Sequence, residues 1–423
     1  MAQGFDLPWR RYTKFESMQY TAQRLSIIEP SPTLAITAKA AELRAQGRDI
    51  VGFGAGEPDF DTPEHIKEAA RVAMAQGQTK YTAVGGTPAL KKAVGDKFRR
   101  DNGQDYKSSE ITVGTGGKQI LYNLFLAYLN PGEEVVVPAP YWVSYADIVR
   151  LAGGVPILVP CPASQHYLMK ADQLEEAITN RTRAVLLNSP SNPTGAVYSE
   201  EQLKALASVL ERYANILAVT DDIYEHILFD GRKFCNILSV APHLRDRVFI
   251  ANGVSKSYSM TGWRIGYGAG PASLIEGMET MQSQSTSNPS SISQAAAVAA
   301  LNGPQNCVED MRVAFERRRN IVVDTFRETP ELKLDPPGGA FYVFPNLSKA
   351  YQLPGFQRAL ISSGDRSASR VFAKILLEKY DVAVVPGIAF GDDNGMRLSF
   401  ALGDDTLKKG LGRISQMVRD MRS

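Results

Sequence analysis

Lys256 and Arg264 are the residues whose types and spacing first suggest chemistry. A lysine amine can form an imine with an aldehyde, and a guanidinium can bind a phosphate through two parallel hydrogen bonds. Lys256 comes soon after the expected strand Val248–Ala251 and directly after Ser255, which suits an attachment site. A solvated surface lysine and a structural arginine would fit the same residues, so other segments of the chain must decide.

Asp221 and Tyr224 form a second signal, at the end of the apolar run Leu217–Thr220. Open α/β sheets hold their ligands at the carboxyl ends of parallel strands. A carboxylate at that position can pair with a protonated pyridine nitrogen, and the Tyr224 hydroxyl can point at the same ring. A helix-capping aspartate and a core tyrosine would fit this pair equally well.

Three further segments follow expected strands in the same way. Asn192-Pro193-Thr-Gly195 predicts a tight turn, with a cis bond as one option, that presents the Asn192 amide at the sheet edge. Gly116-Gly117-Lys118 precedes a helix expected near Gln119, and glycines there let backbone N–H groups approach an anion. Trp142 offers a flat face for stacking, although a lone tryptophan more often belongs to a core.

In their order and spacing, these segments resemble the aspartate aminotransferase family, fold type I of the pyridoxal 5′-phosphate (PLP) enzymes. The resemblance extends to Gly56 in Gly-Ala-Gly56-Glu-Pro-Asp, Tyr81 in Lys-Tyr81-Thr-Ala-Val-Gly, and Arg397 in Met-Arg397-Leu-Ser-Phe. It implies PLP as the cofactor, amino acids and 2-oxo acids as substrates, and a homodimer with shared active sites.

The resemblance also implies a role for each matched residue. Lys256, Asp221 and Tyr224 are expected to be catalytic. The cofactor is expected to contact Tyr81 of the other subunit, Gly116, Gly117, Lys118, Trp142, Asn192, Asp221, Tyr224, Ser255, Lys256 and Arg264. The substrate is expected to contact Gly56, Lys118, Trp142, Asn192 and Arg397, with Arg397 on the α-carboxylate.

The sequence departs from the family pattern at three positions. Gly253 stands where many members have Ser or Thr, so one hydroxyl to the phosphate is missing. Lys118 stands where several relatives have a small polar residue, and resembles a bacterial subgroup in which lysine receives the distal carboxylate of a dicarboxylic substrate. Glu29 stands where prephenate-accepting relatives carry lysine, which argues against that side activity.

The expected function is therefore a PLP-dependent aminotransferase that acts on aspartate or glutamate by ping-pong chemistry. An aromatic or broad-range aminotransferase, and a carbon–sulfur lyase or a cyclopropane-forming synthase on the same fold, stay open as alternatives. A non-catalytic sensor is disfavoured because the lysine is intact and no basic module precedes the fold. A metal site is not expected, because the four histidines have no ligand spacing.

The elements that must position these residues follow from the apolar pattern. Between about residues 110 and 270, short apolar runs alternate with helical segments, which predicts an α/β fold with a mainly parallel central sheet and helices on both faces. The expected strands are Ile111–Val113, Glu134–Val137, Val155–Val159, Ala184–Asn188, Leu217–Thr220, Val248–Ala251 and Arg264–Ala269. Helix starts are expected at Thr62-Pro63, at Thr87-Pro88 and at Ser199, which forms a capping box with Gln202.

Both ends of the chain predict a smaller α+β lobe. A helix from Glu309 to Arg327 is followed by short strands near residues 332–334, 341–344 and 396–400 and by a C-terminal helix. The helix Thr33–Gln46 and the strand Ile50–Phe53 are expected to pack with that part. We expect an N-terminal arm with part of the small lobe over 1–60, a large PLP-binding domain over 61–310, and a small C-terminal domain over 311–423.

Composition narrows the possible partners and location. The 423 residues contain 47 Lys plus Arg against 45 Asp plus Glu, so no broad field for nucleic acid or an acidic membrane is expected. Three scattered cysteines without a disulfide framework favour a reducing compartment, the cytoplasm. The first 20 residues lack a signal-peptide core, although Arg10, Arg11 and Lys14 leave a targeting role open.

Overall fold

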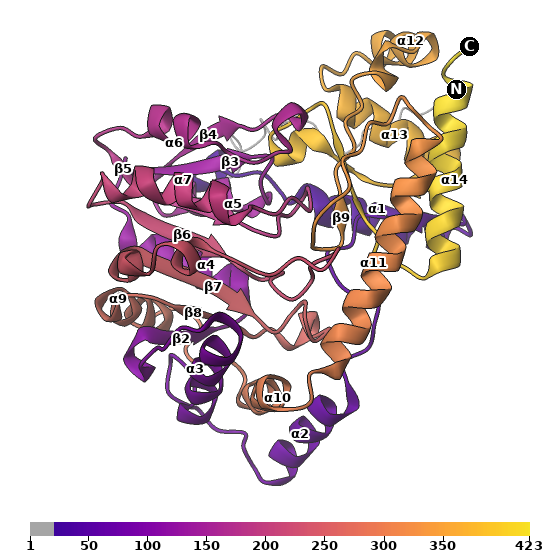
Figure 1. Ribbon diagram of the computed structural model, residues 1–423. Helices are drawn as coiled ribbons and strands as arrows, with labels where there is room; N and C mark the ends of the chain where they lie inside the picture. The colour runs from indigo at the N-terminus through magenta and orange to yellow at the C-terminus, as the bar shows by residue number, and fades with distance from the viewer. Residues whose placement is uncertain (1–20) are drawn as a thin grey trace.

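The computed structural model describes residues 21–423 (Figure 1). The N-terminal targeting question at Arg10, Arg11 and Lys14 lies outside these residues. The strands are β1 (Val51–Gly52), β2 (Ile111–Gly114), β3 (Glu134–Ala139), β4 (Val155–Pro160), β5 (Thr182–Asn188), β6 (Leu217–Asp221), β7 (Val248–Gly253), β8 (Gly266–Ala269), β9 (Tyr342–Val343), β10 (Val382–Ala383), β11 (Val385–Pro386) and β12 (Met396–Ser399). The α-helices are α1 (Pro32–Ala45), α2 (Glu64–Ala75), α3 (Pro88–Asn102), α4 (Gly117–Tyr128), α5 (Ser144–Leu151), α6 (Ala171–Ala177), α7 (Glu200–Glu211), α8 (Ile237–Val240), α9 (Ala272–Ser283), α10 (Ser291–Asn302), α11 (Asn306–Arg327), α12 (Pro354–Ser363), α13 (Ala368–Tyr380) and α14 (Asp404–Asp420).

Seven strands form the central sheet, in the order β2-β8-β7-β6-β5-β3-β4. The strands from β7 to β4 run parallel to one another, whereas β8 runs antiparallel to both β7 and β2. The expected α/β fold with a mainly parallel sheet is thus confirmed. The seven predicted strands are all present, with bounds that differ by a few residues.

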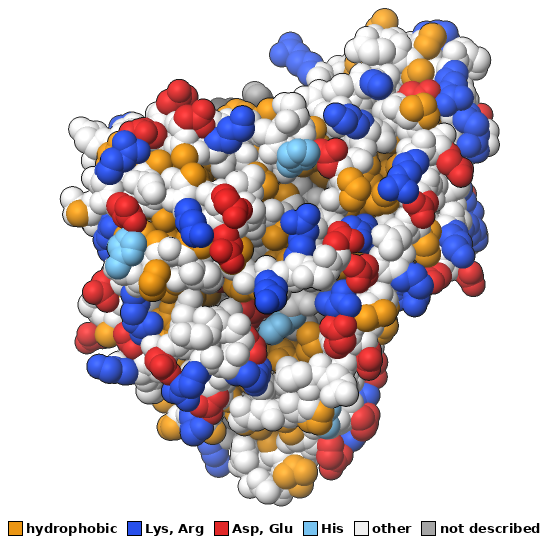
Figure 2. Space-filling view, viewed as in Figure 1, with side chains coloured by type: hydrophobic (Ala, Val, Ile, Leu, Met, Phe, Trp, Pro, Cys, Tyr) orange, Lys and Arg blue, Asp and Glu red, His pale blue; other side chains and the backbone are white. Residues whose placement is uncertain are grey.

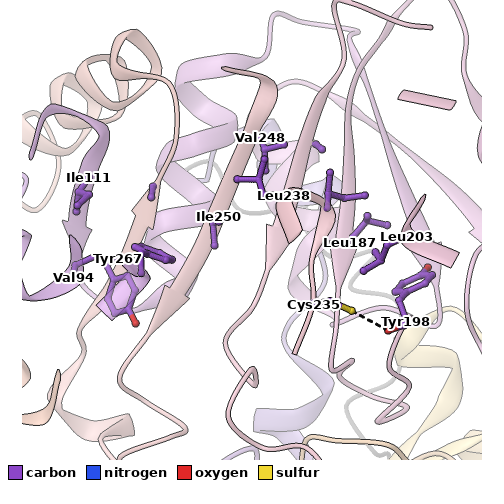
Figure 3. Packing of buried hydrophobic residues seen from close by; sticks show 14 of the residues in the cluster. Val94, Ile111, Leu187, Tyr198, Leu203, Cys235, Leu238, Val248, Ile250 and Tyr267 are labelled. Carbon is purple, nitrogen blue, oxygen red and sulfur yellow. Dashed lines mark hydrogen bonds between the residues drawn. The ribbon is translucent and has the colours of Figure 1, made fainter. Parts of the chain in front are cut away.

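Helices cover both faces of this sheet because successive side chains of each buried strand point to opposite sides. Val135 and Val137 of β3 pack with α4, α5 and α9, whereas Val136 packs on the other face with α3, α7, α8 and α10. Figure 3 shows part of the second face, where Leu187 of β5 lies near Leu203 of α7. This two-sided core fixes the sheet edge at which β5, β6 and β7 end.

The C-terminal elements form a second core around α11, α13 and α14, with α14 lying alongside α11 (Figure 1). Its sheets are the antiparallel set β11-β12-β9 and the parallel pair β1 and β10. Val51 pairs with Val382, and Phe53 is fully buried in this core. The expected packing of the first segment against the C-terminal part is therefore confirmed, while the domain boundaries near residues 60 and 310 stay a prediction.

Two predicted helix starts are confirmed by capping hydrogen bonds. The Ser199 hydroxyl accepts from the backbone N–H of Gln202, whose side chain accepts from the Ser199 N–H. The Thr87 hydroxyl accepts from the N–H of Leu90, with Pro88 in the first turn. Each bond satisfies a backbone donor that the helix itself leaves free.

The third prediction named Thr62 as the residue that caps a helix, and this was wrong. Helix α2 begins at Glu64, and the Thr62 hydroxyl gives it no cap. That hydroxyl instead donates to the Ser259 carbonyl oxygen at 2.7 Å and accepts from the Trp263 indole N–H at 3.0 Å. Thr62 therefore ties the segment before α2 to the segment after Lys256.

One predicted strand start and one predicted short strand were also wrong. Arg264 does not open a strand, because it has a left-handed backbone (φ 56°) after a 3-10 turn, and β8 begins at Gly266. Residues 332–334 contribute only a single bridge, between Lys333 and Asn346. Apolar residues around Leu332 serve the core there without a ladder of backbone hydrogen bonds.

The surface charge and the hydropathy of the helices can be compared with what the composition predicts. Figure 2 shows Lys and Arg side chains interspersed with Asp and Glu side chains over the face drawn. Within residues 21–423, none of the helices has both the length and the apolar character needed to cross a bilayer.

Candidate functional site

A cavity of about 350 Å³ lies at the carboxyl ends of β5, β6 and β7. Most of the predicted site residues line it together: Gly56, Gly117, Lys118, Trp142, Asn192, Asp221, Tyr224, Ser255, Lys256, Arg264 and Arg397. Gly116 lies next to this lining, against Arg264. Tyr81 does not reach the cavity of its own chain; it is 90% exposed, in a separate hollow that also contains Thr79 and Asn288.

Lys256 projects into this cavity from the loop after β7. Its amine donates a 2.5 Å hydrogen bond to the carbonyl oxygen of Gly56. Burial lowers the pKa of this amine to about 8. The negative charge of Glu57 opposes this shift, and the positive charge of Arg264 adds to it. At pH 7 roughly a tenth of an amine with this pKa is unprotonated, far more than of an ordinary lysine, so Lys256 is better able to act as a nucleophile or base.

Arg264 and the glycines before α4 form a cradle of donors. The Arg264 guanidinium donates to the Thr261 carbonyl oxygen at 2.9 Å and stays exposed on its cavity side. A Cβ on Gly116 would overlap this guanidinium, with Arg264 Cζ only 2.9 Å away, and Gly116 has a left-handed φ of 85°. Gly117 begins α4, so free backbone N–H groups face the same place.

Asp221 is the last residue of β6 and is 8% exposed. Its Oδ2 accepts a 2.6 Å hydrogen bond from the Tyr145 hydroxyl, and its Oδ1 accepts from the Ile223 N–H at 3.3 Å. The Asn188 amide donates to the Asp221 carbonyl oxygen at 2.8 Å. Burial raises the pKa of the carboxyl group, and the two donors oppose that rise.

Arg397 is 2% exposed and comes from β12 in the C-terminal part. Its guanidinium donates to Asn192 Oδ1 at 3.0 Å and to the Gly54 carbonyl oxygen at 2.7 Å, while its Nε has no partner among the described residues. A buried guanidinium with a free donor is suited to an anionic ligand. The bond between Asn192 and Pro193 is cis, the option that the sequence had left open.

Tyr224 and Tyr342 meet at the base of the cavity. Their hydroxyl oxygens are 2.9 Å apart, and both side chains are buried. The Tyr342 ring also packs against the Arg397 guanidinium, 4.7 Å from its centroid. Burial raises the pKa of both hydroxyls, so both stay protonated and able to donate.

Lys118 and Trp142 lie at another side of the cavity. The Lys118 ammonium stands 5.1 Å from the centroid of the Trp142 ring. Lys118 keeps contact with solvent, yet partial desolvation of its ammonium, with repulsion from Arg264, lowers its pKa. The ammonium therefore gains from an anionic partner at this position.

Two functional candidates escaped the sequence reasoning. Tyr145 looked like one more apolar residue of a helical repeat. Asn188 stood in the same motif as Asn192, and its place at the end of a strand was the signal that could have found it. The contact between Tyr342 and Tyr224 depends on the fold of segments far apart in the chain, so the spacing of residues does not reveal it.

Histidine, cysteine and acidic side chains do not gather into a metal-binding group within residues 21–423. A lysine of lowered pKa, a buried carboxylate and two guanidinium groups thus share one cavity at the edge of a mainly parallel sheet. Such a set suits an enzyme that uses an organic, anionic cofactor with a carbonyl group.

Solved aspartate aminotransferases have this fold. The crystal structure of the Rhizobium meliloti enzyme matches with a TM-score of 0.89 and 48% identity, over 94% of this chain and 98% of that chain. The Thermus thermophilus enzyme, solved with maleate, matches with a TM-score of 0.86 and 43% identity, over 94% and 100%. The fold is therefore that of the fold type I PLP enzymes.

The sequence model of the family described as aminotransferase class I and II matches residues 48–414. A Nitrosomonas europaea protein named aspartate/prephenate aminotransferase is 51% identical over 397 residues, which cover 94% of this chain and 99% of the relative. A Rhizobium meliloti aspartate aminotransferase is 50% identical over 93% of this chain and 95% of the relative. This chain belongs to the class I and II aminotransferase family, whose members imply PLP as cofactor and amino acids and 2-oxo acids as substrates.

Proposed function

We propose that this aminotransferase moves the amino group of a dicarboxylic amino acid, aspartate or glutamate, to a 2-oxo acid. The observation that carries the proposal is the placement of Arg397 and Lys118 in the same cavity as Lys256. Each cation can hold one carboxylate of such a substrate while its amino group stays near Lys256. The neutral or aromatic side chain of another donor would leave Lys118 without an anionic partner.

The residues of the cavity fit PLP. The missing Cβ of Gly116 leaves room beside Arg264, and the α4 N-terminus provides N–H groups, so this cradle suits the phosphate. Ser255 belongs to the same proposed phosphate site, as does Tyr81 of a second copy of the chain. Asp221 is assigned to the pyridine nitrogen. Trp142 is assigned to stacking on the ring, and Asn192 and Tyr224 to the ring hydroxyl oxygen.

When bound, PLP supplies an aldehyde for Lys256 and a ring that accepts negative charge from the substrate Cα. Displaced from the cofactor by the substrate amine, the Lys256 amine would be free to take the Cα proton as a general base and to deliver it to the C4′ carbon of the cofactor. Asp221 holds a proton on the pyridine nitrogen by charge pairing. Arg397 orients the α-carboxylate so that the Cα proton faces Lys256.

Prephenate is the second candidate acceptor, and two observations bear on it in opposite directions. The Nitrosomonas europaea relative is named for aspartate and prephenate. Glu29 of this chain is acidic where lysine is expected for that activity. It lies near Asp147, whose pKa is raised mainly by burial and further by the charge of Glu29. Prephenate must therefore be tested as an acceptor beside 2-oxoglutarate and oxaloacetate.

A panel of donors tests the proposal. With 2-oxoglutarate or oxaloacetate as acceptor, we expect the purified protein to use aspartate and glutamate in preference to alanine and phenylalanine. The Lys118→Ala variant should lose far more kcat/KM with aspartate and glutamate than with alanine or phenylalanine. Equal losses for all donors would contradict the proposed contact of Lys118 with the distal carboxylate.

The cofactor assignment has its own test. The purified protein should be yellow, and the Lys256→Ala protein should lack this visible absorbance. An unchanged spectrum in that variant would contradict the assignment of Lys256. A cytoplasmic location, suggested by three free cysteines, and a homodimer remain parts of the proposal. Sedimentation of the purified protein, and recovery of activity on mixing Tyr81→Phe with Lys256→Ala chains, would test the shared site.

A further inference from the structure

Tyr145 contacts the proposed cofactor-binding acid without belonging to any motif. It lies near the start of α5, is 2% exposed, and donates a 2.6 Å hydrogen bond to Oδ2 of Asp221. Its ring packs in a T-shaped arrangement with Trp142, with centroids 5.2 Å apart and an interplanar angle of 84°. One side chain therefore contacts two of the groups assigned to the cofactor ring.

The direction of this hydrogen bond is fixed by chemistry. Burial, together with the neighbouring Asp221 charge, raises the pKa of the Tyr145 hydroxyl well above its ordinary value. The hydroxyl thus stays protonated and donates a hydrogen bond to the carboxylate. This hydrogen bond favours the ionised form of Asp221. Among residues 21–423, a buried carboxylate that lost this donor would keep only the longer contact from the Ile223 N–H.

We propose that Tyr145 is a positioning residue, whose hydroxyl holds the Asp221 carboxylate in one orientation as an acceptor for the protonated pyridine nitrogen of the cofactor. This inference rests on the proposed function. The Asn188 amide fixes the Asp221 backbone in the same way, so the acid is restrained at both its carbonyl and its carboxylate. Without the hydroxyl, the carboxylate can turn or take up a proton, and its pairing with the ring nitrogen weakens.

The ring of Tyr145 also fills the core beside α4 and β3, so its packing must be separated from its hydroxyl. Tyr145→Phe removes only the hydroxyl. Tyr351→Phe is the matched control, since Tyr351 is a buried tyrosine that donates at 2.9 Å to the Asp393 carbonyl oxygen and does not line the cavity. Far-UV circular dichroism and thermal unfolding establish that both variants fold.

Binding of PLP to the full-length apoprotein, followed by tryptophan fluorescence, gives a readout that does not depend on turnover. Because Tyr145→Phe removes a hydrogen bond to a charged group, it should raise the PLP dissociation constant and lower kcat, each by roughly 10-fold. The KM for aspartate should stay unchanged, because Tyr145 does not contact Arg397. Tyr351→Phe should leave all three values at those of the unmodified protein.

A double-mutant cycle shows whether Tyr145 acts through Asp221. In the Asp221→Ala background the carboxylate is gone, so adding Tyr145→Phe should change neither the dissociation constant nor kcat any further. Losses that multiply in the double variant, or a Tyr145→Phe protein that matches the unmodified one, would overturn the inference. If the unmodified protein itself fails to bind PLP, the proposed function fails instead, and the two failures are thus distinguishable.

Discussion

The Lys256 amine donates to the carbonyl oxygen of Gly56, a residue 200 positions earlier in the chain. The bond joins the loop after β7 to the loop after β1, and so links the central sheet to the segment that packs with the C-terminal part. It also holds the amine inside the cavity, where burial is the main reason that its pKa falls from 10.5 to about 8. The position of the amine and its reactivity therefore have a common structural origin.

The pH dependence of cofactor capture should follow from this lowered pKa. Only the unprotonated amine can attack an aldehyde, so the rate at which apoprotein captures PLP should rise with pH up to about 8 and then level off. Stopped-flow absorbance from pH 6 to pH 10 measures this rate, with the Lys256→Ala protein as the blank. A rate that keeps rising toward 10.5, the value for an ordinary lysine, would show that Lys256 is not desolvated in solution.

Substitution of Gly116 should damage the cradle beside Arg264 more than it damages the fold. Alanine at Gly116, where φ is 85° and ψ is 159°, costs about 1–3 kcal/mol of backbone strain, and its Cβ would also displace the Arg264 guanidinium. Gly132→Ala is the matched control, because Gly132 has nearly the same φ, 84°, and has no atom within 4 Å of an added Cβ.

Both glycine variants should therefore lose free energy of unfolding in urea, because each places a Cβ on a residue of positive φ. Only Gly116→Ala should also weaken the binding of PLP, by roughly 10-fold for one disturbed charge-assisted contact. Equal PLP affinity in the two variants would mean that the phosphate is bound elsewhere.

The sequence predicted the strand ends that carry the site, because apolar runs followed by polar residues reveal where a buried strand meets the sheet edge. It could not predict that β8 runs antiparallel, since the apolar pattern of a buried strand is the same in both directions. Arg264 was placed in a strand for a related reason. It has a left-handed backbone, and the strand begins only at Gly266, which lies against Gly117, a residue far away in the chain.

The polar contacts of the site were less accessible than its motifs. Thr62 looks like a helix cap because threonine before proline usually is one, yet its hydroxyl is taken by the segment near Ser259. Tyr145 gives no sequence signal, because a tyrosine in an apolar helical repeat fits a core as well as a site. The roles of such side chains become clear only from the fold, which brings their hydroxyls within hydrogen-bond distance of specific acceptors.

A buried ion pair beneath the site gives the last prediction. Lys97 of α3 is 1% exposed and forms an ion pair with Glu225, the residue after Tyr224. The Asn252 amide donates to the same carboxylate at 2.8 Å. Burial opposes ionisation of Glu225, but Lys97, then His226, more than offset it and lower its pKa to about 2. The pair therefore ties α3 to the loops that carry Tyr224 and Lys256.

Lys97→Met should leave the Glu225 carboxylate buried without its cation, at a loss of about 3–5 kcal/mol in the free energy of unfolding. Lys92→Met is the control in the same helix, because Lys92 is 76% exposed and its pair with Asp96 is worth about 0.5 kcal/mol or less. Since the folded-state pKa of Glu225 is depressed, its stabilisation is present above about pH 4.5 and fades as the pH falls toward 2.

The stability difference between the unmodified protein and Lys97→Met should accordingly be largest near neutral pH and shrink in acid, as urea titrations at pH 7, 4 and 3 would show. Glu225→Gln in the Lys97→Met background removes the unpaired charge, and should restore part of the loss while keeping a side chain that can hydrogen-bond to Asn252. A Lys97→Met protein as stable as Lys92→Met at pH 7 would contradict the pair's role, because a carboxylate this deeply buried costs stability without its cation, whether it stays ionised or takes up a proton.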